Sequence, residues 1–212
     1  MIATPATADL FADAPLPHGL CYRPDFLSRD EEAALLGTLP SLPFKEALFQ
    51  QYTARRRVVR FGALFDEQTK AWTEGPALPA DLVALRARAA RWVGIAPTAF
   101  VHALVTEYRI GTPIGWHRDK PHYGLVVGIS LAGACRMRFR PMAARSDRER
   151  AIALELAPRS AYVLRDDIRW HWQHHIPPTK ALRYSITFRT RVAGDGNGAA
   201  EELRRQPTDE GS

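Results

Sequence analysis

The pattern of apolar and polar positions changes from helical spacing in the first half of the chain to short alternating segments in the second. Residues 28–40 predict a helix, because Ser28 is a favourable N-cap and Glu31 completes a capping box. Residues 78–94 predict a second helix with one apolar stripe. Most of the chain after these two helices favours strands.

Six segments that follow the second helix are rich in β-branched and aromatic residues and are separated by turn residues, as is typical of strands. They are residues 99–110, 124–133, 135–142, 151–158, 160–166 and 183–192. Two helices followed by six or more short strands predict helices packed outside an antiparallel double sheet. The expected fold class is therefore mainly β with flanking helices, around a double-stranded β-helix (jelly-roll) core.

Length and composition predict one globular domain of 212 residues, with 46% hydrophobic and 25% charged residues. We expect that domain to span residues 20–192, between an N-terminal segment, 1–19, and an acidic tail, 193–212, that both lack fixed structure. No apolar run has the length of a membrane span, and no secretion signal is recognisable. Two cysteines cannot form a disulfide framework, so we expect a cytoplasmic protein. We also expect a monomer without membrane association.

The formal charge is unevenly distributed along the chain. Residues 1–19 carry a charge of −2 and residues 195–212 a charge of −3. Because the net charge of the whole chain is +6, residues 20–194 carry +11. A basic body favours a polyanionic partner such as nucleic acid, although a solvated basic surface would have the same composition.

The first candidate for chemistry is the stretch GWHRDKPHYG, residues 115–124, in which His117 and Asp119 are two residues apart. On a strand these two side chains would project from the same face. A two-His-one-carboxylate site for a divalent metal needs one more imidazole, and leaves three positions open for substrates and oxygen. More than fifty residues later the chain supplies three candidates for it: His171, His174 and His175.

The second candidate is the stretch RYSITFR, in which alternation predicts that Arg183, Ser185, Thr187 and Arg189 share one face of a strand. If that face lines a barrel interior, its guanidinium groups need an anion, because unpaired buried charge is costly. A dicarboxylate would satisfy them, since arginine binds carboxylates in bidentate fashion.

The order of these motifs, with Tyr108 upstream and WQHHIPP between them, resembles the AlkB-type 2-oxoglutarate- and Fe(II)-dependent dioxygenases over residues 20–192. The resemblance implies that His117 and Asp119 bind iron. Because the family ligand stands two residues after the tryptophan, Trp172 makes His174 the third ligand.

The resemblance also implies three cofactors and co-substrates: Fe(II), 2-oxoglutarate and O₂. Arg183 would bind the distal carboxylate of 2-oxoglutarate with help from Tyr108, Ser185 would contact it, and Arg189 would lie near the metal. Two positions depart from the family. Thr106 stands where many members have Asn, and Lys120 with Pro121 follows HxD where base-repairing members have an acidic residue.

The function implied by the resemblance is oxidative removal of alkyl groups, such as methyl or etheno groups, from nucleic-acid bases, as in DNA alkylation repair. We expect DNA rather than RNA as the partner. Such an enzyme needs cationic and aromatic side chains at its entrance. The stretch YTARRRVVRFG lies where the family has its substrate lid and offers Arg55, Arg56, Arg57 and Arg60 beside Tyr52 and Phe61. Of these we expect Arg57, Arg60 and Phe61, together with Lys120, to contact the substrate.

A second basic group is predicted on one strand face, where Arg136, Arg138 and Arg140 alternate as a possible phosphate track. Two alternatives to dealkylation stay open. One is the same oxidation of a protein side chain or a small molecule. The other is a non-catalytic nucleic-acid-binding barrel that keeps a metal site as a relic.

Overall fold

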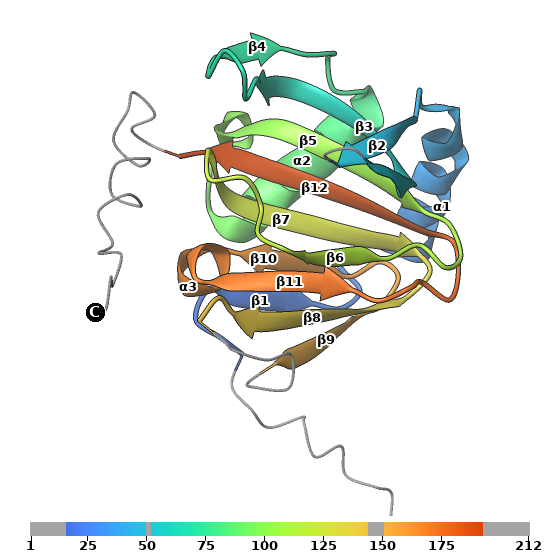
Figure 1. Ribbon diagram of the computed structural model, residues 1–212. Helices are drawn as coiled ribbons and strands as arrows, with labels where there is room; N and C mark the ends of the chain where they lie inside the picture. Colours follow the sequence, from blue (N-terminus) through green and yellow to red (C-terminus); the bar gives the residue numbers. More distant parts are fainter. Residues whose placement is uncertain (1–15, 50–51, 144–150, 193–212) are drawn as a thin grey trace, which may run out of the picture.

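Two antiparallel sheets form the body of the molecule (Figure 1). The computed structural model describes residues 16–49, 52–143 and 151–192, and all structural statements concern these. The larger sheet has the order β1 (Leu20–Arg23), β10 (Ala161–Leu164), β7 (Tyr123–Ala132), β12 (Arg183–Arg191), β5 (Phe100–Tyr108), β3 (Tyr52–Phe65) and β2 (Lys45–Phe49), with β4 (Trp72–Glu74) beside β3. The smaller sheet has the order β6 (Ile114–His117), β11 (Trp172–Ile176), β8 (Cys135–Pro141) and β9 (Ile152–Leu156). The expected jelly-roll class is confirmed.

Two of the three helices cover the outer face of the larger sheet: α1 (Arg29–Thr38) and α2 (Ala80–Val93), which lies behind the strands in Figure 1. The capping box of α1 is present, with the Glu31 amide donating to Ser28 Oγ at 3.1 Å and the Ser28 amide donating to Glu31 Oε2 at 2.7 Å. Leu82 and Leu85 of α2 are buried in the same apolar cluster as Phe188 of β12. This packing leaves the other face of the larger sheet to the smaller sheet.

A second apolar cluster fills the space between the sheets. Met137 and Phe139 of β8 are 1% exposed and pack with Leu164 of β10 and Val126 of β7. Cys135 belongs to this cluster, as its apolar surroundings in the sequence predict. The third helix, the short α3 (Asp166–Trp170), follows β10 and contributes Ile168 to the cluster. One end of the sandwich is therefore closed by apolar packing.

The structure differs from the sequence analysis most in the basic stretch YTARRRVVRFG. All of it belongs to the long strand β3, which pairs with β5 from Arg57 opposite Glu107 to Gly62 opposite His102. Extended backbone gives alternate side chains opposite directions, so the arginines of this stretch divide between two faces.

The ends of the domain also differ in part. Residues 16–19 form an ordered turn, in which the His18 carbonyl accepts from the Ile168 amide at 3.1 Å and the Gly19 carbonyl from the Arg165 amide at 3.2 Å. Segments 1–15 and 193–212, where we expected a lack of fixed structure, lie outside the described residues. No helix in the described ranges is both long and apolar enough to cross a membrane.

Gly62 is required where β3 passes β5. Its φ is +75°, and a Cβ atom there would lie 2.3 Å from the Val101 carbonyl oxygen, whereas Gly111 has a φ of +79° with open space around it. We predict that Gly111→Ala costs about 1–2 kcal/mol of unfolding free energy through backbone strain alone. Gly62→Ala should cost roughly a further 1–3 kcal/mol through the clash. Urea unfolding of both variants measures the difference; equal losses would contradict the tight approach of β3 to β5.

Candidate metal centre and cofactor pocket

The pairing of β6 with β11 brings two imidazoles together. His117, at the end of β6, is the direct partner of His174 on β11, and their ring centroids are 4.2 Å apart. Asp119 follows two residues after β6. Ligand atoms of all three side chains lie within 4.8 Å of one another. Two ligands on one ion, each at roughly 2.0–2.2 Å, lie at most about 4.4 Å apart, so small side-chain adjustments would let the three share one metal.

The protonation of the three side chains suits metal binding. Burial lowers the pKa of His174 to about 3, and burial also lowers the pKa of His117, so both imidazoles are neutral. Burial raises the pKa of the Asp119 carboxyl, but the pKa stays below its ordinary value, chiefly because of the positive charge of Arg189. His117 Nδ1 lies 2.9 Å from the Gly115 carbonyl oxygen, which directs Nε2 toward the centre. Two neutral imidazoles and a carboxylate are the donor set that a divalent iron site uses.

Arg169 of α3 holds the loop that carries Asp119. Its side chain is 2% exposed and donates to four backbone carbonyls of that loop. Nε donates to Gly124 at 2.9 Å, Nη1 to Asp119 at 3.3 Å, and Nη2 to Lys120 at 2.7 Å and to Tyr123. Sequence reasoning missed this residue, because its partners are backbone atoms more than forty residues away. Asp119 lies beyond the end of β6, so this loop, and not strand alternation, places it beside His117.

The predicted 2-oxoglutarate residues lie together on β12 and its neighbour β5. Arg183 is 1% exposed, is paired in register with Tyr108, and has its guanidinium 5.1 Å from the Tyr108 ring centroid. Its Nε donates to Ser130 Oγ at 2.9 Å, while its Nη1 and Nη2 have no hydrogen-bond partner among the described residues. A buried cation with two unused donors fits a carboxylate ligand.

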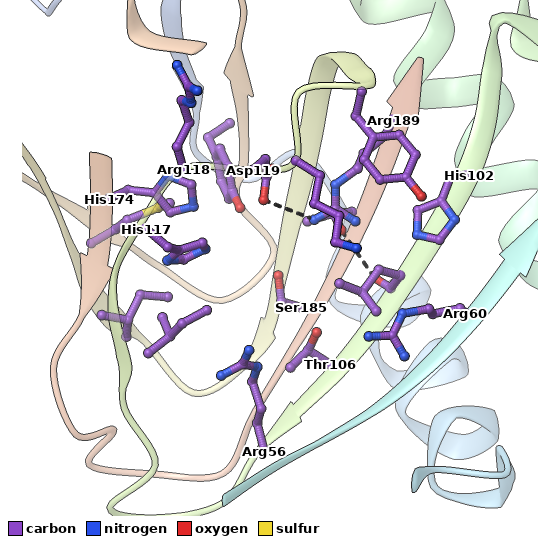
Figure 2. Close-up of a pocket in the computed structure, with 18 of the residues that line it drawn as sticks. Arg56, Arg60, His102, Thr106, His117, Arg118, Asp119, His174, Ser185 and Arg189 are labelled. Carbon is purple, nitrogen blue, oxygen red and sulfur yellow. Dashed lines mark hydrogen bonds and ion pairs between the residues drawn. The ribbon is translucent and has the colours of Figure 1, made fainter. Parts of the chain in front are cut away.

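A cavity of about 480 Å³ lies between the sheets and contains the three candidate ligands (Figure 2). Tyr108, Thr106 and Ser185 line it. Arg183 is not part of the lining, but its guanidinium lies against the ring of Tyr108. Arg189 also lines it and donates to Asp119 Oδ1 at 3.4 Å, the contact drawn in Figure 2. The cavity therefore joins the candidate metal centre to the residues predicted to hold the co-substrate.

Only part of the predicted substrate set faces this cavity. Arg60 and Lys120 line it, but Phe61 is buried in the core under the helices, and Arg57 forms a bidentate ion pair with Glu107 at 2.7 and 2.8 Å. The prediction for Arg57 and Phe61 is wrong, because odd and even positions of β3 point to opposite faces. Arg56, on the same face as Arg60, lines the cavity instead, and the alternation of a strand could have identified it.

The remaining basic candidates lie elsewhere. Arg136, Arg138 and Arg140 alternate with buried residues of β8, and Arg138 and Arg140 lie over the Trp116 ring, outside the cavity. Pro121 forms part of the turn after Asp119 and does not line the cavity. The side chains of Tyr52 and Arg55 lie outside the described residues.

A model of the 2OG-Fe(II) oxygenase superfamily matches residues 19–189. The chain belongs to this superfamily. Its members use Fe(II), 2-oxoglutarate and O₂, which agrees with the His-Asp-His group in the cavity.

One curated relative is similar in sequence to this oxygenase: Uncharacterized protein L905 of Acanthamoeba polyphaga mimivirus, 31% identical over 102 residues. The similarity spans 42% of this chain and 47% of that protein, so the chain matches about half of the relative's length.

Solved structures support the fold of the oxygenase. OsALKBH1 superimposes with a TM-score of 0.65 at 16% identity, covering 84% of this chain and 99% of that one. A prolyl-4-hydroxylase from Pseudomonas putida superimposes with a TM-score of 0.58 at 14% identity, covering 84% and 95%. At these identities the matches concern the jelly-roll fold. The resemblance to AlkB-type enzymes is confirmed at the level of superfamily and fold.

We predict that Arg169→Lys weakens metal binding by about 10–100-fold, the usual loss when a group supporting a ligand is removed. Lysine keeps the charge but cannot bind four carbonyls at once. Titration of the variant with Mn(II), followed by electron paramagnetic resonance, gives the metal affinity. Arg165→Lys is the matched control, because Arg165 precedes α3 and its exposed side chain contacts Asp166 and not the loop that carries Asp119. Unchanged metal affinity in Arg169→Lys would contradict the positioning role.

Proposed function

We propose that this oxygenase removes alkyl groups from nucleic-acid bases by Fe(II)- and 2-oxoglutarate-dependent oxidation. The observation that carries the proposal is the His117–Asp119–His174 group in a cavity whose wall residue Tyr108 contacts the buried Arg183, a side chain with two unused donors. DNA as the preferred nucleic acid, a monomeric state and a cytoplasmic location stay predictions.

Fe(II), 2-oxoglutarate and O₂ would supply the oxidising chemistry, in which one oxygen atom enters a C–H bond of the substrate and the other enters the succinate left after 2-oxoglutarate loses CO₂. On an N-methyl group this gives a hydroxymethyl group, which leaves as formaldehyde and returns a hydrogen to the base nitrogen. The protein binds, orients and excludes water around these reactants.

In this proposal His117, Asp119 and His174 hold the metal. The Gly115 carbonyl fixes the ring of His117, and Arg169 fixes the backbone of Asp119. Arg189 contacts the Asp119 carboxylate at 3.4 Å, so it keeps that carboxylate ionised and oriented. These contacts hold the three ligands before the metal binds, which reduces the cost of assembling the site.

Arg183 holds the distal carboxylate of 2-oxoglutarate in this proposal. Tyr108 lies against its guanidinium, and Ser185 lines the cavity between Arg183 and the metal ligands. Thr106, which pairs with Ser185 across β5 and β12, adds a second hydroxyl to the same wall. The family departure at Thr106 therefore leaves a polar lining in place.

A nucleic-acid substrate is supported by the AlkB homologue among the structural matches and by the basic cavity wall formed by Arg56 and Arg60 of β3. A second candidate, hydroxylation of a protein side chain, is supported by the match to a prolyl-4-hydroxylase. The two are separated by substrate: oligonucleotides with alkylated bases against proline-containing peptides.

We predict succinate formation, coupled to loss of the alkyl mass, with at least one member of a panel of methylated and etheno-modified oligonucleotides. Mass spectrometry of both products measures this. If succinate formation is coupled to oxidation of the peptides but of none of the oligonucleotides, the second candidate is favoured. Binding of oligonucleotides without any turnover would favour the non-catalytic barrel.

We predict that His174→Ala lowers metal affinity and turnover by about 100-fold or more, since removing a ligand costs at least as much as removing a supporting group. His171→Ala is the matched control, because His171 is exposed and lies three residues away. Calorimetric titration with Mn(II) and a succinate assay report the two effects. Equal losses in both variants would contradict the ligand assignment.

We predict that Arg183→Gln raises the KM for 2-oxoglutarate about 10–100-fold, as expected for loss of charge-assisted hydrogen bonds worth roughly 1.5–3 kcal/mol. Metal affinity should not change. Arg191→Gln, on the exposed end of the same strand, serves as the control. A change in metal affinity with an unaltered KM would place Arg183 in a different role.

A further inference from the structure

The cavity lining is dominated by positive charge. Its charged side chains are one carboxylate, Asp119, and five cations: Arg56, Arg60, Arg118, Lys120 and Arg189. A site of this composition has an electrostatic preference that is independent of the oxidation chemistry.

Three of the five cations already have partners. Arg189 contacts Asp119 at 3.4 Å, and Lys120 Nζ lies 2.8 Å from Glu67 Oε1, which comes from the turn between β3 and β4. Arg118 donates to the Trp170 carbonyl at 2.8 Å and keeps its net charge there. Acidic compensation within the described cavity and its rim is therefore limited to two carboxylates.

Arg56 and Arg60 differ from the other three. Among the described residues neither forms a hydrogen bond or an ion pair, and both project from β3 toward the cavity (Figure 2). Arg60 lies at the side of the cavity near His102, whereas Arg56 lies on the side nearer Thr106 and Ser185. Two uncompensated guanidinium groups thus flank the space that is left for a substrate.

Binding of the cofactors does not reverse this balance. Asp119 and the 2-oxoglutarate dianion carry negative charge. The positive charge of Fe(II), Arg183 and Arg189 together is larger. The positive charges of Arg56 and Arg60 remain over and above that set. The loaded pocket is therefore cationic where the substrate enters.

Titratable groups along the wall respond to the same field. The pKa of Arg60 is lowered by its burial and then by the charges of Arg189 and Arg56. Burial lowers the pKa of His102 to about 3, with further lowering by Arg189 and Arg60. Additional positive charge in this part of the cavity is disfavoured.

We propose that this pocket selects alkylated bases that carry no charge and discriminates against bases that N-alkylation makes cationic, with Arg56 and Arg60 as the specificity-determining residues. The proposal rests on the proposed function. The physical reason is direct: a cationic ring would be placed beside two guanidinium groups, and like charges at a protein surface repel more strongly than in bulk water.

Two N3-methylated pyrimidines of nearly the same shape test this. 3-Methylthymine is neutral at pH 7.5 and 3-methylcytosine is cationic. Short single-stranded DNA oligonucleotides containing one or the other are titrated into the full chain loaded with Fe(II) and 2-oxoglutarate without O₂, so that binding is measured without turnover. We expect the 3-methylthymine oligonucleotide to bind about tenfold more tightly, equivalent to ~1.4 kcal/mol.

The ratio of the two dissociation constants is the readout, because loss of a phosphate contact would weaken both oligonucleotides equally. Arg60→Gln and Arg56→Gln should each bring the ratio toward one. Arg91→Gln, the same change on the exposed end of α2, should leave it unchanged. Thermal melting identifies any variant that fails to fold, and the other variant then carries the comparison.

Equal binding of the two oligonucleotides by the unmutated protein, or tighter binding of 3-methylcytosine, would overturn the proposed selectivity while leaving base dealkylation intact. Such a result would mean that substrate phosphates neutralise the two arginines. If neither modified oligonucleotide binds more tightly than the unmodified one, the pocket does not recognise alkylated bases, and both the selectivity and the proposed function fail.

Discussion

Buried positive charge is the constraint on which this barrel depends. Arg169 and Arg183 are among the largest fully buried side chains, and Arg189 is 7% exposed. An arginine cannot shed its proton to avoid burial, so each guanidinium needs acceptors. Arg169 takes backbone carbonyls, Arg189 takes the Asp119 carboxylate, and Arg183 takes one hydroxyl, with two nitrogen atoms left over. If Arg183 binds the co-substrate as proposed, the carboxylate supplies acceptors for these two nitrogen atoms, and co-substrate binding then stabilises the fold.

The same contacts tie the candidate metal ligands to the sheet that carries the residues proposed to bind the co-substrate. Arg169 on α3 and Arg189 on β12 both reach the segment of Asp119, one through its backbone and one through its carboxylate. Register pairing of β6 with β11 supplies His117 and His174. The smaller sheet therefore supplies both imidazoles, the larger sheet supplies Arg189, and the loop after β6, which carries Asp119, connects the two sheets. Oxidising power belongs to the metal and oxygen, whereas geometry and discrimination belong to these side chains.

Several local features were predictable because neighbouring residues determine them. The capping box of Ser28 and Glu31 is a contact over three residues, and the residue pattern identified six of the twelve strands in the described part of the chain. The motif order led to His117, Asp119 and His174, which the structure brings into one group. The error at Arg57 and Phe61 came from treating a basic stretch as a lid, although strand alternation divides it between an inner and an outer face.

The sequence by itself determined the jelly-roll class, the candidate metal ligands and the strand that carries Arg183, because each depends on residue type and short spacing. Tertiary structure alone decided which arginines face the cavity and how Asp119 reaches its partners. Arg169 and Asp119 are fifty residues apart and meet through a backbone carbonyl, an acceptor that every residue possesses. Such a contact cannot be predicted from the pattern of side chains along the sequence. The charge that surrounds the substrate space is likewise a property of the assembled sheets, since Arg56 and Arg60 face the metal ligands only when β3 pairs with β5.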